Sequence, residues 1–253
     1  MKKKSAAKKV ALVTGAGGGI GSVTALEFAA RGYQVAVCDM DAASAGATVA
    51  AIKQAKGKAR AYVTDIGDAA AVHALFSAIE QDFGRLDAAF NNAGLGGART
   101  ALADVALSDW ERIVRVNLTG TFLCMQHEIK LMIAGGGGAI VNNGSIFAIN
   151  GGISAPYTAT KHGIAGLTKS AALSYADKHV RVNAVCPGLI EAGMGLKVLK
   201  RASTNPKELI AAHPVNRTGS ALEVAHAVLW LCSDEASFVH GHLLAVDGGY
   251  SAR

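Results

Sequence analysis

The sequence has few cysteines, and they stand far apart. Cys38, Cys124, Cys186 and Cys232 form no Cys-x-x-Cys pair and no dense framework. Small secreted domains depend on closely spaced disulfides, and thiolate metal sites use short spacings. Both classes are therefore disfavoured, and we expect reduced thiols in a cytoplasmic protein.

Long apolar runs are also missing. No stretch approaches the roughly 18 residues that a membrane-spanning helix needs. The lysine-rich start resembles the positive region of a signal peptide, but Val10–Val13 is only four apolar residues long before Thr14 and the glycines. We therefore predict a soluble protein with no membrane partner.

Net charge is small outside the first nine residues. Five of the 25 basic residues are Lys2, Lys3, Lys4, Lys8 and Lys9, and the remainder balances 20 basic against 19 acidic residues. A nearly neutral body offers no broad surface for phosphate backbones. We therefore predict a flexible basic arm over residues 1–9 and no nucleic-acid partner.

Short apolar runs alternate with segments of helical periodicity along the rest of the chain. This alternation is typical of βαβ units and a parallel sheet covered by helices. Expected strands begin near Val10, Gln34, Ala59, Ala88, Ala139, Val180 and Leu243, and expected helices span 21–30, 42–55, 69–83, 108–133, 155–177 and 221–232. The sequence predicts an α/β fold with one doubly wound Rossmann-type domain over residues 10–253, containing a seven-stranded parallel sheet with helices on both faces.

A glycine-rich stretch lies between the first expected strand and helix. Gly15, Gly19 and Gly21, with Ile20 among them, can turn the chain sharply and let backbone approach a pyrophosphate. The N-terminus of the following helix adds free N–H groups and partial positive charge. The pattern predicts a dinucleotide site, with an ordinary glycine-rich turn as the alternative.

Asp39 ends the second apolar run, 18 residues after Gly21. A carboxylate at this strand end can accept hydrogen bonds from both hydroxyls of an adenosine ribose, and it repels a 2′-phosphate. This position favours NAD over NADP. The alternative is a cap or turn residue before the next helix, where Asp41 and Ser44 are also candidates.

Tyr157 and Lys161 are four residues apart on an expected helix and share one of its faces. An ammonium near the phenol is expected to lower its pKa from about 10, so that Tyr157 can exchange a proton with a substrate hydroxyl. This pair alone is a weak signal. Ser145, which follows an apolar run 12 residues earlier, adds a hydroxyl that can bond the substrate oxygen.

The order of these motifs resembles the short-chain dehydrogenase/reductase family. Thr14–Gly21 has the form Thr-Gly-x-x-x-Gly-x-Gly, and Ser145 precedes Tyr157-x-x-x-Lys161. The resemblance covers about residues 10–250. It implies hydride transfer between a nicotinamide cofactor and an alcohol or ketone, in a homodimer or homotetramer. Gly18 and Met40 stand where NADP-binding members often carry Arg or Lys.

The resemblance also implies roles around the cofactor. Asp65 matches the adenine-contacting position, although a plain loop aspartate is equally compatible. Asn91, Ala93 and Gly94 belong to the Asn-Asn-Ala-Gly segment that borders the cofactor. Asn117 falls inside the helix expected over 108–133, where asparagine is a mediocre interior residue, so we expect a local kink or a bound water there. By the resemblance, its carbonyl holds a water linking Lys161 to solvent; the alternative is a solvent-facing or helix-packing asparagine.

Pro187 and Gly188 resemble the segment that covers the nicotinamide, where the Ile190 backbone can donate and accept hydrogen bonds. Ala192 departs from the family pattern, because a threonine often bonds the carboxamide there.

Two further segments leave alternatives open. Residues 191–215 mix apolar and basic side chains, which suits either a substrate lid or one amphipathic helix packed on the body. His240 and His242 place two imidazoles on one face of an expected strand, but no third ligand is nearby, so we predict no metal site.

These observations predict an NAD-dependent alcohol dehydrogenase that acts reversibly on a secondary alcohol and its ketone, with Asn117, Ser145, Tyr157 and Lys161 as its catalytic set. One alternative is an NADPH-dependent ketone reductase of the 3-oxoacyl type, against which Asp39 argues. Another is a protein that binds NAD as a scaffold or sensor without turnover.

Overall fold

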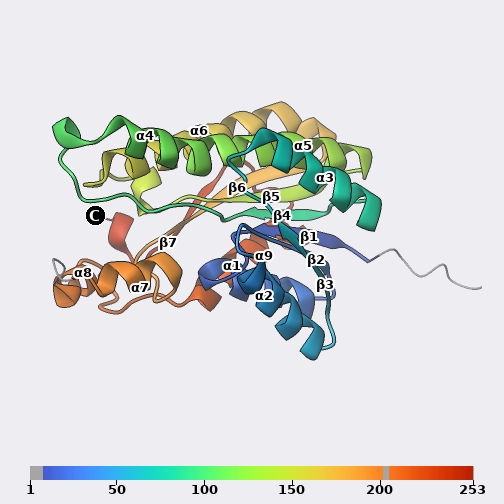
Figure 1. Cartoon of the computed structure of the whole chain (residues 1–253), viewed down its shortest axis with the longest axis horizontal. Coiled ribbons are helices and arrows are strands. Elements are labelled where there is room, and N and C mark those ends of the chain that lie inside the picture. The colour runs from blue at the N-terminus through green and yellow to red at the C-terminus, as the bar shows by residue number, and fades with distance from the viewer. Residues whose placement is uncertain (1–7, 202–204, 253) are drawn as a thin grey trace, which may run out of the picture.

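The protein contains one seven-stranded parallel sheet, in a computed structural model that describes residues 8–201 and 205–252 (Figure 1). The strand order is β3-β2-β1-β4-β5-β6-β7, which is a doubly wound order and confirms the predicted fold class. The strands are β1 (Val10–Thr14), β2 (Gln34–Asp39), β3 (Lys58–Val63), β4 (Ala88–Asn91), β5 (Gly138–Asn143), β6 (Val180–Pro187) and β7 (Leu243–Val246).

Helices cover both faces of the sheet. On one face lie α1 (Gly19–Ala30), α2 (Ala42–Gln54) and α9 (Ala221–Cys232); on the other lie α3 (Ala69–Phe83), α4 (Leu107–Val114), α5 (Thr121–Ala134) and α6 (Ala155–Tyr175) (Figure 1). Two short helices, α7 (Gly193–Leu199) and α8 (Pro206–Ala211), lie beyond the end of the sheet near β7.

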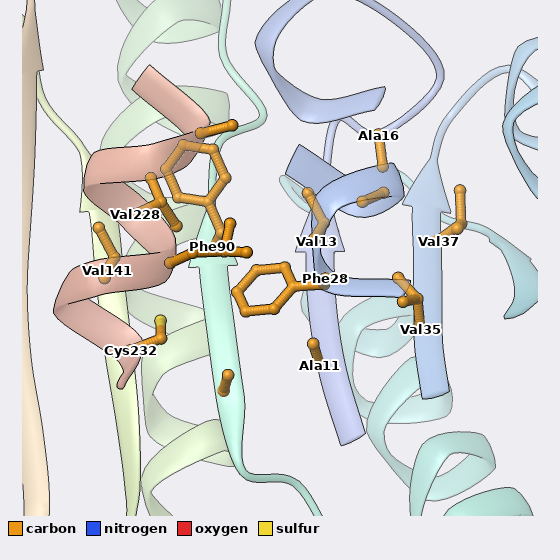
Figure 2. Packing of buried hydrophobic residues seen from close by; sticks show 14 of the residues in the cluster. Ala11, Val13, Ala16, Phe28, Val35, Val37, Phe90, Val141, Val228 and Cys232 are labelled. Atoms are coloured by element: carbon orange, nitrogen blue, oxygen red, sulfur yellow. The ribbon is translucent and has the colours of Figure 1, made fainter. Parts of the chain in front are cut away.

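The central strands are buried on both faces, so their residues alternate between two cores. In β1, Ala11 and Val13 pack with Phe28 of α1, as Figure 2 shows. Val10 and Leu12 belong instead to the core under α3 and α5. This burial explains why β1 is a continuous apolar run rather than an alternating one.

The structure has continuous helical backbone over residues 107–134, close to the single helix predicted over 108–133, but this helix is not α-helical throughout. A π-helical turn over Arg115–Gly120 separates α4 from α5. The side chain of Asn117 is buried and bonds the backbone of Leu95 instead of facing solvent. The local irregularity expected at Asn117 is therefore present, and π turns are frequent at functional sites.

The segment after β6 is not one amphipathic helix. It forms α7 and α8 as two separate short helices, with residues 202–204 between them outside the described part of the chain. The prediction that His240 and His242 share one face of a strand is also wrong. They lie in the loop before β7, where Gly241 has a φ of +68°, so they do not share a strand face.

The predicted basic arm lies mostly outside the described residues, which begin at Lys8. Lys8 and Lys9 are both exposed. Across the described chain, no helix combines the length and apolar character required to cross a bilayer.

A carboxyl group is fully buried between the sheet and α5. Glu128 Oε2 accepts a hydrogen bond from Asn91 Nδ2 at 2.9 Å, and the same amide donates to Asn142 Oδ1 at 3.0 Å. Burial raises the pKa of Glu128 to about 8, and the hydrogen bond from Asn91 opposes this only in part. Glu128 is therefore protonated in the folded protein at neutral pH.

This pKa predicts a pH-dependent stability. An unfolded glutamate titrates near pH 4.3, so between about pH 4.5 and 8 the folded chain holds a proton that the unfolded chain loses. Stability should fall across that range. In urea unfolding, the free energy of unfolding of the wild type should decrease by about 4 kcal/mol from pH 5 to pH 9, and Glu128→Gln should abolish this decrease. The exposed Glu80→Gln is the control and should keep the wild-type pH dependence. If the free energy of unfolding of wild type and of Glu128→Gln changed with pH in parallel, the raised pKa of Glu128 would be contradicted.

Candidate active site

A cleft of about 870 Å³ opens at the carboxyl ends of the strands. It crosses the point between β1 and β4 where the strand order reverses, the usual ligand position in doubly wound sheets. Its lining includes Gly15, Gly19 and Ile20 at one side, and Ser145 and Tyr157 at another. The structure therefore brings the two predicted motifs to one cavity.

The glycine-rich loop is packed too closely to carry side chains at several positions, among them Gly15 and Gly21. Gly15 has a φ of +62°, and a Cβ there would lie 2.8 Å from Ala93 Cα. A Cβ on Gly21 would lie 2.2 Å from the Gly15 carbonyl oxygen. Gly21 does not line the cleft. It lets α1 approach the loop, so that Gly19 and Ile20 are exposed to the cavity at the start of that helix.

Asp39 lines the cleft and also supports the glycine-rich loop. Its Oδ2 accepts a hydrogen bond from the Gly17 N–H at 2.8 Å, and its Oδ1 accepts one from Asp41 N–H at 3.0 Å. The cap of α2 is Asp41, whose side chain accepts from Ala43 N–H. Asp41 is therefore the cap of α2, while Asp39 both makes a turn through its bond to the Asp41 N–H and lines the cavity.

Asp65 lies on the same side of the cleft and forms an ion pair with Arg115. Its Oδ2 is 2.9 Å from Arg115 Nη1, and its Oδ1 accepts from Gly67 N–H at 2.9 Å. Burial acts to raise the pKa of Asp65, but the hydrogen bonds from Arg115 and Gly67 prevail and lower it. Asp65 is thus a charged residue in the lining of the cleft, and Arg115 of the π turn holds it in place.

Tyr157 stands near the start of α6 with Lys161 beside its ring. The Lys161 Nζ lies 5.3 Å from the ring centroid and donates to the Asn143 carbonyl oxygen at 2.6 Å. Lys161 is buried, and this burial lowers its pKa to about 8. The ammonium therefore sits beneath the tyrosine, tied to the end of β5.

We predicted that Lys161 lowers the pKa of Tyr157. This prediction is wrong, because the protein's own groups together raise that pKa. Burial raises the pKa of Tyr157, and a hydrogen bond from Ser145 opposes that rise. Desolvation disfavours the charged phenolate, and the protein does not fully compensate for it. Ser145 is nevertheless close enough to hydrogen-bond the phenol, and its Oγ also accepts from Phe147 N–H at 3.2 Å. The predicted bond from Ser145 to a substrate oxygen stays a prediction.

Asn117 and Lys161 do not line the cleft but lie directly behind it. Asn117 Oδ1 accepts from Leu95 N–H at 2.7 Å, and its Nδ2 donates to the Leu95 carbonyl at 2.9 Å. Its own main-chain carbonyl accepts from the Thr121 hydroxyl at 2.8 Å. The side chain thus fixes the cleft loop around Leu95, whereas the predicted water relay stays a prediction.

The Asn-Asn-Ala-Gly segment divides between the cavity and the interior. Ala93 and Gly94 line the cleft, whereas Asn91 ends β4 in the buried network with Glu128. The neighbouring Asn92 lines the cleft instead and donates to the Thr14 and Gly15 carbonyls at 3.0 and 3.1 Å. Asn91, which the resemblance places beside the cofactor, therefore does not reach the cleft, whereas Asn92 does.

The segment after β6 forms a further wall. Pro187, Gly188, Ile190 and Ala192 all line the cleft. The Ile190 carbonyl accepts from Ala192 N–H at 2.8 Å, so part of its backbone is already used within the segment. Ala192 is the N-cap of α7 and contributes no side-chain cap.

Comparisons with known proteins identify the family. Residues 15–251 match the family model described as Enoyl-(Acyl carrier protein) reductase. Cyclohexanol dehydrogenase of Acinetobacter sp. (strain SE19) is 41% identical over 247 residues, which are 97% of this chain and 96% of that protein. The chain belongs to the short-chain dehydrogenase/reductase family. It is therefore an oxidoreductase of that family.

Two solved members of the short-chain dehydrogenase/reductase family share the fold. The structure of levodione reductase has a TM-score of 0.93 at 35% identity, covering 96% of this chain and 98% of that one. A putative 2-deoxy-D-gluconate 3-dehydrogenase from Agrobacterium tumefaciens, solved with bound NADP, has a TM-score of 0.89 at 35% identity and full coverage of both chains.

Sequence reasoning missed several residues of this short-chain dehydrogenase/reductase site, above all Arg115, Asn92 and His213. Arg115 and His213 reach the cleft from segments far from the motifs they contact. Asn92 lies inside a recognised segment and directly follows Asn91, the last residue of β4. Because neighbouring side chains alternate along extended backbone, the sequence could have indicated that only one of the two asparagines enters the cleft. In the described chain, no three His, Cys, Asp or Glu side chains gather as a metal site would require.

Proposed function

We propose that this protein is an NAD-dependent dehydrogenase that converts a secondary alcohol to its ketone reversibly. The observation that carries the proposal is a single cleft with the glycine-rich loop and Asp39 on one side and Ser145 and Tyr157 on another. The close-packed glycines and the inward carboxylate fit a dinucleotide, because they offer backbone N–H groups to phosphates and acceptors to a ribose.

The protein's part in the reaction is to orient the substrate and move one proton. A bound nicotinamide supplies the hydride acceptor. Ser145 bonds the substrate oxygen, and Tyr157 takes the hydroxyl proton in oxidation or returns it in reduction. Lys161, held by the Asn143 carbonyl, supplies positive charge beneath the phenol.

The raised pKa of Tyr157 has a directional consequence. Since burial favours the neutral phenol, the protein alone prepares Tyr157 to donate a proton, which serves ketone reduction. Oxidation needs the phenolate, which a positively charged nicotinamide ring beside the phenol would stabilise. Oxidation should therefore gain from higher pH and reduction from lower pH.

The substrate wall favours an apolar ring. Leu95, Phe147, Ile153 and Met194 line the same cleft as Tyr157, and the Phe147 ring lies edge-on at 6.4 Å from that of Tyr157. Cyclohexanol, the substrate named for one relative, is a cyclic secondary alcohol. We infer a cyclic secondary alcohol or ketone for this protein.

We retain two further predictions, a cytoplasmic location and a homodimer or homotetramer. The four cysteines are free and buried, which suits a reducing compartment. Large apolar side chains exposed on α4, α5 and α6 support self-association: Leu107, Trp110, Phe122 and Leu173.

Turnover should depend on the Tyr157 hydroxyl. With cyclohexanol and related ring alcohols, followed through nicotinamide absorbance, Tyr157→Phe should lower kcat by about 10² to 10⁴ because the proton has no carrier. Binding of NADH should change little. Tyr175→Phe, on the same helix, is the matched control and should retain activity. Equal turnover in wild type and Tyr157→Phe would remove the proposed base, and tight NADH binding without any turnover would favour the scaffold alternative.

Cofactor choice should depend on the Asp39 charge. We infer a preference for NAD, although the Agrobacterium tumefaciens relative binds NADP. Asp39→Asn keeps the size and one acceptor oxygen but removes the repulsion of a 2′-phosphate, so the ratio of kcat/KM for NAD over NADP should fall at least about tenfold. Asp41→Asn, outside the cleft lining, should leave the ratio unchanged. A wild type that prefers NADP would establish the reductase alternative.

A further inference from the structure

His213 is a buried histidine in the wall of the cleft, directly after α8. It is 5% exposed, and its two ring nitrogens bond two different segments. Nδ1 lies 2.9 Å from the Leu209 carbonyl oxygen, and Nε2 lies 3.0 Å from the Leu189 N–H nitrogen. A carbonyl only accepts and an N–H only donates, so Nδ1 carries the hydrogen and Nε2 accepts. The two contacts define one neutral tautomer.

The segment that His213 holds is the wall formed by Pro187–Ile190. Two backbone hydrogen bonds also fix it, from Gly188 N–H to the Val246 carbonyl at 3.1 Å and from Gly219 N–H to the Leu189 carbonyl at 2.9 Å. His213 adds a side-chain anchor at the Leu189 N–H. The imidazole also packs against Gly188, where a Cβ would lie 2.8 Å from Nε2.

The donor side of the imidazole connects this wall to α8. Leu209 belongs to α8, and both Leu209 and Ala212 line the cleft beside His213. The Tyr250 ring, 5.1 Å from the imidazole, closes the site from the C-terminal turn. One side chain thus joins α8 to the backbone after β6.

We propose that His213 is a positioning residue for the cofactor: its Nε2 fixes the Leu189 N–H and thereby sets the Pro187–Ile190 backbone against the nicotinamide. This inference rests on the proposed function, because it assumes that the nicotinamide lies along this wall. His213 acts through Leu189 rather than on the reacting atoms.

Two substitutions separate the two hydrogen bonds of the imidazole. In His213→Gln, the amide oxygen is three bonds from Cβ, as Nε2 is, so it can replace the acceptor for Leu189. In His213→Asn, the amide nitrogen is two bonds from Cβ, as Nδ1 is, so it can replace only the donor to Leu209. The exposed His73→Asn on α3 is the matched control.

Cofactor affinity should depend on whether residue 213 keeps an acceptor for the Leu189 N–H. Titrations with NADH and with NADPH, read by nicotinamide fluorescence, should show binding about tenfold weaker in His213→Asn, because the Leu189 N–H loses its partner. KM for the cofactor should rise in parallel, while KM for the alcohol stays within about threefold. His213→Gln should remain within about threefold of wild type, as should His73→Asn.

Other patterns overturn the proposal. If His213→Asn binds cofactor as wild type does, or if His213→Gln is impaired as much as His213→Asn, the acceptor does not position the cofactor. A lower unfolding temperature in His213→Asn with unchanged affinity assigns the residue to stability alone. Wild type that binds neither NADH nor NADPH refutes the proposed function as well, whereas wild-type binding with unchanged variants refutes only the role of His213.

Discussion

The site depends on the contact between the ends of β1 and β4. The Thr14 hydroxyl accepts hydrogen bonds from the Asn92 and Ala93 N–H groups at 3.0 and 3.1 Å, and the Asn92 amide returns hydrogen bonds to the Thr14 and Gly15 carbonyls. These bonds join the two strands where the strand order reverses. The glycine-rich loop can lie against β4 only because Gly15 and Gly21 have no side chains, and the cleft is the space that this junction opens.

Burial governs the chemistry at the catalytic end. It raises the pKa of Tyr157 and lowers that of Lys161 to about 8, so both shifts oppose the charged forms that alcohol oxidation uses. The protein offsets part of this cost through the Ser145 hydrogen bond to the phenol and the Asn143 carbonyl beneath the ammonium. In the function we propose, the positive charge of an oxidised nicotinamide beside the phenol would oppose the effect of burial on Tyr157.

Local patterns predicted the parts of the molecule that local forces determine. The apolar run of β1, the glycines after it and the strand-end Asp39 follow from neighbouring residues, and the irregular helix at Asn117 follows from a polar residue that had to be satisfied inside. Arg115 and His213 could not be predicted, because their partners Asp65 and Leu189 are distant in the chain. The direction of the pKa shift of Tyr157 could not be predicted either, because desolvation depends on how completely distant segments bury the phenol.

A structure of the protein crystallised with NAD and a ring-alcohol inhibitor tests the central claim most directly. The account predicts that the pyrophosphate lies against Gly19 and Ile20, that the nicotinamide faces Tyr157, and that the inhibitor oxygen lies within hydrogen-bond distance of both the Tyr157 and Ser145 hydroxyls. A dinucleotide bound in another orientation, with the Tyr157 oxygen remote from both the nicotinamide and the inhibitor, would contradict it.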